Sequence, residues 1–298
     1  MKSQGLSRKQ FSVLTYLERS SAVKTQRAVA EATGMSLGSV NRILTELAEQ
    51  NLVDGYNLTP GAYEALEPYR VKRAVFIAAG FGSRLVPITL NTPKPLVRVN
   101  GVRMIDTLLD AVNAAGIEEV YIVRGYLGEQ FDQLLYKYPN IRFIENPIYN
   151  EANNISSAMC VRHLLQNAYV LEADLVLYNP GLITKYQYTS NYLGVPTDVT
   201  DDWCFETKNR LITKVMVGGR NCHHMYGISY WNAEDGAKLY EDIKAVYEMP
   251  GGKERYWDLV PLSYCREHYQ VEVRECTFED IIEIDTYSDL KRLDKVYC

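Results

Sequence analysis

The sequence has no hydrophobic run long enough to cross a membrane, no Cys-x-x-Cys pair and no excess of basic residues. A membrane-spanning helix needs about 18 or more largely apolar residues, and the N-terminus also lacks the apolar core of a secretion signal. The six cysteines are scattered, a pattern that favours free thiols in a reducing compartment over a disulfide framework. These absences predict a cytoplasmic protein with no membrane segment.

The charge and length of the chain also limit its class. A net charge of −5 over 298 residues argues against wholesale binding to nucleic acid or to a membrane surface. Hydrophobic residues make up 47% of the chain and charged residues 23%, as in ordinary globular proteins. The length suits two domains. The pattern changes near residue 70, so we expect domains over residues 1–70 and 71–298.

The first 70 residues read as a small helical domain. Apolar spacing predicts helices over Leu6–Arg19, Thr25–Thr33 and Leu37–Gln50. Gly34 is a typical residue for ending the second helix, and Ser36 is a typical N-cap for the third. Two helices joined by a short turn that contains glycine form the helix-turn-helix pattern.

The string TQRAVAEATGMSLGSVNRILTEL resembles the winged helix-turn-helix of MarR-type regulators, with Leu52–Leu58 as a short wing. In that arrangement the residues facing a DNA groove would be Ser36, Ser39, Asn41, Arg42 and Thr45. Residues 1–70 contain eight Lys or Arg and seven Asp or Glu, which is far from the basic footprint of a DNA-binding domain. Two interpretations therefore stay open for this domain: DNA binding, and self-association or docking.

From Lys72 onward, predicted strands and helices alternate. The expected strands are Ala74–Ala79, Glu119–Val123, Ile141–Glu145 and Tyr169–Ala173, and the expected helices are Met104–Ala114, Gly128–Tyr136, Ile155–Leu165 and Leu182–Tyr188. Such alternation predicts a mostly parallel sheet covered by helices on both faces, an α/β fold. A β-rich part follows, with strands at Trp203–Thr207, Leu211–Val217, Met225–Tyr230, Gln270–Cys276 and Ile281–Ile284 and helices at Ala233–Glu248 and Tyr256–His268.

A glycine-containing loop follows the first of these strands. Gly80 and Gly82 lack a Cβ, so backbone N–H groups there can approach a phosphate closely. Arg84 and Lys94 add positive charge to the same segment. A dinucleotide-binding fingerprint would require glycine where Leu85 stands, and the Gly-Lys-Ser/Thr of a P-loop is absent. The glycines alone would also suit a plain tight turn.

The whole segment VFIAAGFGSRLVPITLNTPKPL resembles the signature of nucleotidyltransferases that act on sugar phosphates and phosphocholine. The resemblance implies a Rossmann-like, mostly parallel sheet, in this chain preceded by the small winged helix-turn-helix domain. It also implies that Lys94 and Arg84 are catalytic. The triphosphate of the nucleotide would contact Ala79, Gly80, Gly82, Ser83 and Arg84.

Two pairs of acidic residues lie at predicted strand ends. Glu172 and Asp174 share one face of their strand, as do Glu283 and Asp285, because alternate residues of a strand point the same way. Acids at strand ends are often only hydrogen-bonded loop residues. The resemblance implies that Asp174 and Asp285, together with Glu283, hold Mg²⁺, and it leaves the role of Glu172 open.

Two later loops are candidates for reading the nucleobase. Gly125 and Tyr126 follow the second parallel strand, and Asn154 and Ser156 stand at the start of a predicted helix. Side-chain amides and hydroxyls pair well with a pyrimidine edge, but Ser156 is equally suited to capping the helix. The string NPIYNEANNISSAM resembles this region of bacterial CTP:phosphocholine cytidylyltransferases, which implies CTP as the nucleotide.

Aromatic residues gather in the β-rich part beside carboxylates. Trp203 follows Asp202, and Trp257 precedes Asp258. Aromatic faces attract a quaternary ammonium through cation–π interactions, although such residues are more often part of a core. We predict a cage of Trp203, Tyr226 and Trp257, with Asp202 and Asp258 beside it, for the choline group.

The resemblance thus implies an enzyme that transfers CMP from CTP to phosphocholine and releases pyrophosphate. Phosphoethanolamine, 2-aminoethylphosphonate or a sugar-1-phosphate are alternative acceptors. An interpretation from another class is a DNA-binding regulator whose second domain senses a nucleotide or a choline metabolite without turnover. That alternative does not require both metal-binding carboxylates.

Overall fold

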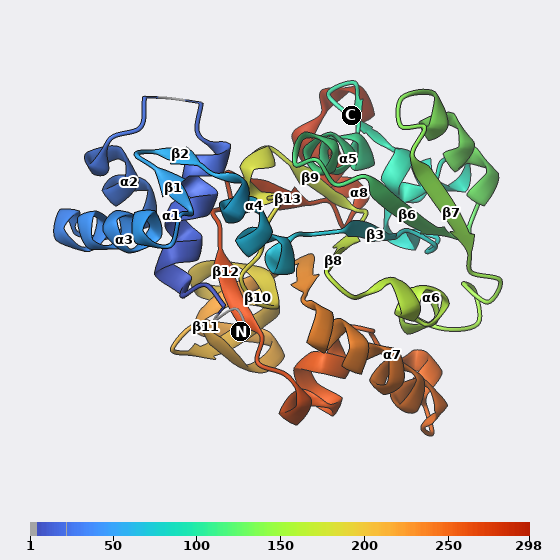
Figure 1. Ribbon diagram of the computed structural model, residues 1–298. Helices are drawn as coiled ribbons and strands as arrows, with labels where there is room; N and C mark the ends of the chain where they lie inside the picture. Colours follow the sequence, from blue (N-terminus) through green and yellow to red (C-terminus); the bar gives the residue numbers. More distant parts are fainter. Residues whose placement is uncertain (1–4, 22) are drawn as a thin grey trace. The chain divides into compact units, whose positions relative to one another are not determined.

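The computed structural model (Figure 1) describes residues 5–21 and 23–298. The chain divides into two compact units, with the boundary between Arg70 and Val71. Among the described residues, no helix has both the length and the apolar character needed to cross a membrane.

The first unit is helical with a minimal two-stranded wing. Its helices are α1 (Arg8–Arg19), α2 (Gln26–Thr33), α3 (Leu37–Glu49) and α4 (Pro60–Leu66), and its strands are β1 (Val53–Asp54) and β2 (Asn57–Leu58). Gly34 ends α2 in the left-handed conformation (φ 66°), and the Ser36 hydroxyl accepts a hydrogen bond from the Ser39 amide at the start of α3. These are the end signals expected from the sequence, and the predicted helix-turn-helix is confirmed.

The second unit is built on a seven-stranded sheet with the strand order β10-β12-β11-β8-β3-β6-β7. These strands are β3 (Arg73–Ile77), β6 (Glu119–Arg124), β7 (Ile141–Glu145), β8 (Ala168–Glu172), β10 (Asn191–Lys208), β11 (Leu211–Trp231) and β12 (Glu272–Glu275). Strands β7, β6, β3 and β8 are parallel, whereas β11 runs antiparallel to β8. The predicted mostly parallel sheet is confirmed.

Smaller elements complete this unit. Strands β9 (Leu175–Leu177) and β13 (Ile281–Glu283) form an antiparallel pair, and so do β4 (Arg98–Val99) and β5 (Val102–Arg103). The helices are α5 (Met104–Ala114), α6 (Ile155–Val161), α7 (Ala233–Glu248) and α8 (Tyr287–Leu293). Figure 1 shows α5 on one side of β3, β6 and β8, and α6 with α7 on the other.

The sheet has a separate hydrophobic core on each face. Ala74 and Phe76 of β3 pack with α5, whereas Val75 points to the opposite face and packs with α6 and α7. Because β3 is buried on both faces, it reads as a continuous apolar run rather than as an alternating one.

The register of the parallel strands positions the loops that follow them. Ile77, the last residue of β3, lies opposite Val123 of β6 and Glu172 of β8. The loop after β3 and the turn after β8 therefore leave the sheet at the same edge. This edge, at the carboxyl ends of the strands, is where ligands bind in open α/β sheets.

Two predicted helices are wrong. Residues 182–188 contain only the end of a short 3₁₀ turn (Pro180–Leu182). The helix predicted over Gly128–Tyr136 is present with those bounds and is of the 3₁₀ type. Residues 256–268 are broken into a π-turn at Val260–Tyr264 and a 3₁₀ turn at Arg266–His268. In residues 182–188 and 256–268 short turns held by local hydrogen bonds take the place of a continuous helix. For example, the Cys265 N–H donates a hydrogen bond to the Val260 carbonyl at 2.8 Å.

Candidate active site

The loop after β3 packs closely against the segment that carries Lys94. Gly82 has a φ of 67°, and a Cβ on it would lie only 2.9 Å from the Cβ of Lys94. The Thr89 hydroxyl donates a hydrogen bond to the Gly82 carbonyl at 3.0 Å. Only glycine readily adopts this left-handed backbone conformation and also leaves room for Lys94 at this position.

Lys94 is buried in the wall of the site, with 8% of the residue exposed. Its ammonium donates hydrogen bonds to Asp174 Oδ2 at 2.9 Å and to Asp285 Oδ1 at 3.3 Å. Burial alone would lower the pKa of Lys94, but the carboxylates of Asp174 and Asp285 outweigh it and raise this pKa. The side chain is therefore held in its charged form.

The two acidic strand ends meet because β9 and β13 pair. Glu283 lies opposite Leu175, and the Ile284 N–H donates a hydrogen bond to the Asp174 carbonyl at 3.2 Å. One carboxylate oxygen from each of Asp174, Glu283 and Asp285 lies within 4.8 Å of the others. This is an all-oxygen set of the kind that binds Mg²⁺. Asp174 Oδ1 is buried and has no hydrogen-bond partner among the described residues, so it is available as a ligand.

Arg84 reaches the same carboxylate cluster from the glycine loop. Its guanidinium forms a two-pronged ion pair with Asp285, with nitrogen–oxygen distances of 2.7 and 2.9 Å. The Arg84 side chain is 63% exposed, so an anionic ligand can reach its guanidinium from solvent.

These groups line a cavity of about 520 Å³ at the carboxyl edge of the parallel strands. Most of the residues predicted from the sequence lie in its wall: Ala79, Gly80, Gly82, Ser83, Arg84, Lys94, Asn154, Ser156, Asp174, Asp202, Trp203, Asp258, Glu283 and Asp285. Four predicted residues are not among those that line it: Gly125, Tyr126, Tyr226 and Trp257.

Glu172, whose role the sequence left open, also lines the cavity. Asn154 Nδ2 donates a hydrogen bond to Glu172 Oε1 at 3.4 Å, and a Cβ on Gly227 of β11 would lie 2.4 Å from Glu172 Oε2. Burial raises the pKa of Glu172 well above its ordinary value, and the nearby carboxylates of Asp174 and Asp258 add to this effect. Gly227 leaves the space that this carboxyl group occupies.

The predicted aromatic cage is only partly assembled around the cavity. Trp203 lines it and stacks edge-on against Tyr256, with ring centroids 5.7 Å apart. Trp257 is 1% exposed and packs on Trp231, while Tyr226 is 4% exposed and packs against Phe278 and His224. Tyr256, which the sequence analysis did not select, takes the place expected for Trp257.

Asp258 is the least exposed acidic residue of the cavity, at 6%. Its Oδ1 atom is buried and has no hydrogen-bond partner among the described residues. Burial raises the pKa of Asp258 to about 6, against an ordinary value of 3.8, although backbone hydrogen bonds act in the opposite direction. A buried carboxylate oxygen that lacks a partner is costly, and a cationic ligand at Oδ1 would reduce that cost.

The side of the cavity beyond the glycine loop is polar. The Asn146 amide, 2% exposed, donates hydrogen bonds to the Ser156 and Ser157 hydroxyls at 2.9 and 3.0 Å. Gly125 lies behind this wall, because a Cβ there would meet the Tyr149 side chain at 2.6 Å. Tyr126 stacks edge-on against Phe81, with centroids 4.5 Å apart, outside the lining.

Sequence reasoning missed several residues of this wall, namely Asn146, Tyr149, Ser157 and Gly227. Asn146 follows β7 directly, so its position after a parallel strand was a usable signal. Tyr149 and Ser157 lie within the string NPIYNEANNISSAM, whose family resemblance was a usable signal. Gly227 had none, because it reaches the cavity from the neighbouring strand β11.

Together, the parallel sheet, the glycine loop and the Lys94–carboxylate cluster define a nucleotidyltransferase. Residues 74–189 match the model of the MobA-like NTP transferase domain, and residues 4–55 match that of the MarR family. Among solved structures, the chain is similar to the CTP:phosphocholine cytidylyltransferase of Streptococcus pneumoniae, with a TM-score of 0.70 and 32% identity over 77% of this chain and all of that one. An inositol-1-phosphate CTP transferase from T. maritima, 17% identical with a TM-score of 0.61, shares the fold.

Similarity in sequence extends over three quarters of the chain. A 2-aminoethylphosphonate cytidylyltransferase of Lancefieldella rimae is 34% identical over 228 residues, which are 75% of this chain and 92% of that protein. The choline-phosphate cytidylyltransferase of Streptococcus pneumoniae is 32% identical over 228 residues, 75% of this chain and 97% of that protein. The chain belongs to the cytidylyltransferase family of nucleotidyltransferases.

Proposed function

We propose that the second unit transfers CMP from CTP to phosphocholine, forming CDP-choline and pyrophosphate. The observation that carries this proposal is the convergence of Lys94, Asp174 and Asp285 beside the glycine loop, in one cavity with Trp203. The similarity to two choline-phosphate cytidylyltransferases, at 32% and 29% identity, supports the choice of reaction.

We propose Mg²⁺ as the cofactor, held by Asp174, Glu283 and Asp285. Three convergent carboxylates and the unpartnered Asp174 Oδ1 fit a hard divalent cation. When bound, the ion neutralises charge on the triphosphate and on the leaving pyrophosphate. Lys94 and Arg84 together offer two positive charges against three carboxylates, so a further cation also relieves their mutual repulsion.

The protein groups act mainly by positioning and by charge. The amides after β3 and the Arg84 guanidinium bind the β- and γ-phosphates, as glycine loops bind anions elsewhere. Lys94 stands between the α-phosphate and the acceptor oxygen, where negative charge gathers as the new bond forms. The acceptor phosphate is already ionised at neutral pH, so its attack requires no general base. Asn154, Ser156 and the polar wall around Asn146 read the cytosine edge.

The acceptor's cationic end lies against Trp203 and Tyr256 in this proposal. Their rings border the cavity, and the carboxylate of Asp202 is beside them. A quaternary ammonium makes no hydrogen bonds, so aromatic faces and a nearby negative charge are the interactions that suit it.

A second acceptor is favoured by the Oδ1 atom of Asp258, which has no hydrogen-bond partner among the described residues. A primary ammonium donates hydrogen bonds and would satisfy Asp258 Oδ1, which a trimethylammonium group cannot do. This points to 2-aminoethylphosphonate or phosphoethanolamine, and the similarity to a 2-aminoethylphosphonate cytidylyltransferase supports it.

A single assay separates these acceptors. The protein is incubated with Mg²⁺, each of the four NTPs and a panel of phosphocholine, phosphoethanolamine, 2-aminoethylphosphonate and glucose-1-phosphate, and pyrophosphate is measured. Turnover restricted to CTP and phosphocholine supports the main proposal. Preference for the primary amines supports the second, and nucleotide binding without any turnover would favour a sensing regulator.

For the first unit we propose self-association or docking rather than DNA binding. Among the residues expected to face a groove, Arg42 is the single basic one, and it pairs with Glu46 at 3.5 Å. Sedimentation of the full chain and fluorescence anisotropy with duplex DNA at low salt test this. Strongly salt-dependent DNA binding by a monomeric chain would contradict it.

A further inference from the structure

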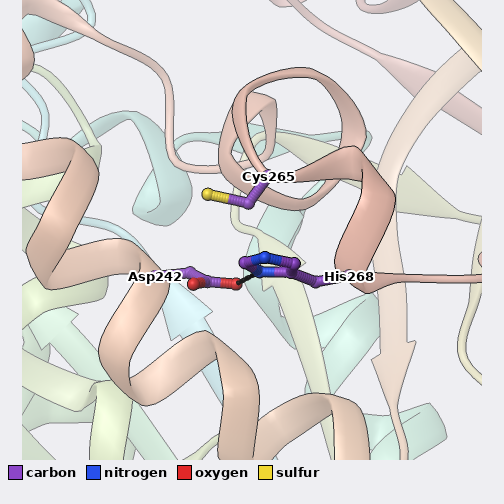
Figure 2. A group of neighbouring side chains, drawn as sticks. All are labelled: Asp242, Cys265 and His268. Carbon is purple, nitrogen blue, oxygen red and sulfur yellow. Dashed lines mark hydrogen bonds and ion pairs between the residues drawn. The ribbon is translucent and has the colours of Figure 1, made fainter.

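A second group of potential metal ligands lies among residues that do not line the active-site cavity. Asp242 of α7, Cys265 and His268 bring a carboxylate, a thiol and an imidazole together (Figure 2). Cys265 and His268 are separated by two residues on one turn, a spacing that lets both side chains reach the same ion. The reaction proposed above uses none of these three residues.

The geometry of this Asp-Cys-His group is close to that of a metal site. One ligand atom from each residue lies within 4.8 Å of the others, and His268 Nδ1 lies 2.8 Å from Asp242 Oδ2. Zinc bonds of about 2.0–2.3 Å in a tetrahedron place ligand atoms about 3.3–3.6 Å apart. Figure 2 shows the Cys265 sulfur on the same side of the turn as the Asp242–His268 pair. Small side-chain movements therefore suffice to surround an ion.

We propose that Asp242, Cys265 and His268 bind one Zn²⁺ ion, with water as the fourth ligand. A thiolate, an imidazole and a carboxylate are the three ligand types that zinc combines, whereas Mg²⁺ binds oxygen ligands. Binding replaces the Asp242–His268 hydrogen bond and the Cys265 S–H bond with bonds to the metal. The thiol proton passes to solvent, and the neutral imidazole of His268 carries its single N–H on the nitrogen that does not bind the metal.

The surroundings support the three ligands. The Tyr269 hydroxyl donates a hydrogen bond of 2.5 Å to Asp242 Oδ2, which orients the carboxylate as supporting groups do in metal sites. Lys238 donates a hydrogen bond to the His268 carbonyl at 3.1 Å, and its charge is offset by Glu234 at 2.9 Å and Asp235 at 3.3 Å. The His268 side chain is 48% exposed, so an ion can enter from solvent.

The ion would join α7 to the turn at Cys265–His268, which follows the cavity-lining residues Tyr256 and Asp258 in the chain. Cys265 is seven residues after Asp258, and Leu262 N–H donates a hydrogen bond to the Asp258 carbonyl at 3.2 Å. Since Asp258 lines the acceptor end of the cavity, a site at Cys265 would stabilise the backbone that positions it. We expect a structural role, with activity retained at saturating substrate.

Cobalt spectroscopy tests the site without relying on activity. Co²⁺ added to the full chain should give a thiolate-to-cobalt charge-transfer band at one ion per chain, which one equivalent of Zn²⁺ abolishes. The carboxylates of Asp174, Glu283 and Asp285 cannot produce this band, because they offer no sulfur. Competition with a zinc indicator then gives the affinity for Zn²⁺.

Matched variants assign the band to these residues. Cys265→Ser should abolish it, and His268→Ala should weaken Zn²⁺ binding more than tenfold, whereas Tyr269→Phe should weaken it about tenfold. Cys298→Ser and His163→Ala are controls that should change nothing. Absence of the band in the wild-type chain overturns the proposal, and so does a band that survives in Cys265→Ser. Circular dichroism shows whether Cys265→Ser is folded. If it is not, the folded His268→Ala variant decides, and a Zn²⁺ affinity equal to that of the wild type overturns the proposal.

Discussion

The ammonium of Lys94 lies 2.9 Å from the carboxylate of Asp174, although 80 residues separate them in the chain. Asp285 completes the contact at 3.3 Å, and Arg84 in turn pairs with Asp285. The two cations that we propose bind phosphates and the carboxylates that we propose bind a metal thus partly neutralise one another in the ligand-free protein. This arrangement keeps a highly charged cavity stable before its ligands arrive.

Replacing Lys94 should therefore affect both catalysis and stability. Lys94→Ala removes charge stabilisation at the reacting phosphates, so turnover should fall on the order of 10²- to 10³-fold. It also leaves Asp174 and Asp285 without their shared cation, which should cost about 1 to 3 kcal/mol of unfolding free energy. Pyrophosphate release and denaturant unfolding measure the two effects. Lys72→Ala, at an exposed lysine, is the control; wild-type turnover in Lys94→Ala would refute the role proposed for Lys94.

Gly227 should be intolerant of even the smallest side chain. A Cβ there would lie 2.4 Å from Glu172 Oε2, so Gly227→Ala should push the Glu172 carboxyl into the cavity. Such overpacking costs about 1–3 kcal/mol, and the KM for the acceptor should rise. Gly38→Ala serves as the control, because a Cβ at Gly38 meets nothing within 4 Å. Equal acceptor KM values in the two variants would show that Glu172 does not border the acceptor.

Much of the fold and of the charged cluster could be predicted, because the end of each parallel strand shows where the residues that follow it lie in the sheet. In a parallel sheet the carboxyl ends meet at one edge, so Gly82 and Asp174 could be brought together from the strand pattern alone. Helix α5 and helix α7 have the predicted bounds, since their apolar spacing coincides with clear ends at Gly116 and Asn232. The approach of Asp285 came from the family resemblance, because no local pattern reveals that β13 pairs with β9.

The aromatic end of the cavity, where we propose that the acceptor binds, was harder to predict because it depends on which side of the backbone each ring lies. Trp257 and Asp258 are neighbours, yet Trp257 packs under Trp231 while Asp258 lines the cavity. Because the segment is not a regular helix, its residues have no helical periodicity from which the direction of each side chain could be inferred. Strand β10 was likewise recognised only at its end, since Gly194 and Pro196 usually interrupt strands.

Substitution of Trp203 should reveal the nature of the acceptor. If the acceptor is phosphocholine, Trp203→Ala removes a cation–π contact worth about 0.5–2 kcal/mol and should raise the acceptor KM about 2- to 30-fold. The Kd for CTP should change little, because the residues that we propose contact the nucleotide lie on other loops. Calorimetry with CTP and steady-state kinetics with each acceptor provide the two measurements. Tyr136→Ala, at a 99% exposed tyrosine, is the control. The Asp258→Asn variant tests the second acceptor class. A KM that is raised for the primary amines but unchanged for phosphocholine in this variant would favour that class.

The pKa of Asp258 predicts how acceptor binding and stability depend on pH. As the pH falls through about 6, this carboxylate is protonated and loses its attraction for the acceptor's cation, so the acceptor KM should rise. Acceptor phosphates also titrate near this pH, and the ratio of KM values for wild type and Asp258→Asn removes that contribution. The ratio should approach one below pH 5, and a ratio constant from pH 5 to 8 would contradict the proposed contact.

The effect of Asp258 on stability should have the opposite pH dependence: the folded chain should gain stability as the pH falls. The folded-state pKa of Asp258, about 6, lies above its ordinary value of 3.8, so the folded chain holds this proton more tightly than the unfolded chain. The charged group therefore costs stability above pH 6, and that cost disappears as the pH falls toward 4. Without ligands, Asp258→Asn should be more stable than wild type at pH 7.5, by up to about 3 kcal/mol, and the difference should vanish near pH 4. Thermal unfolding across this range measures it, and a difference that does not depend on pH would mean that Asp258 is already neutral or paired in the free protein.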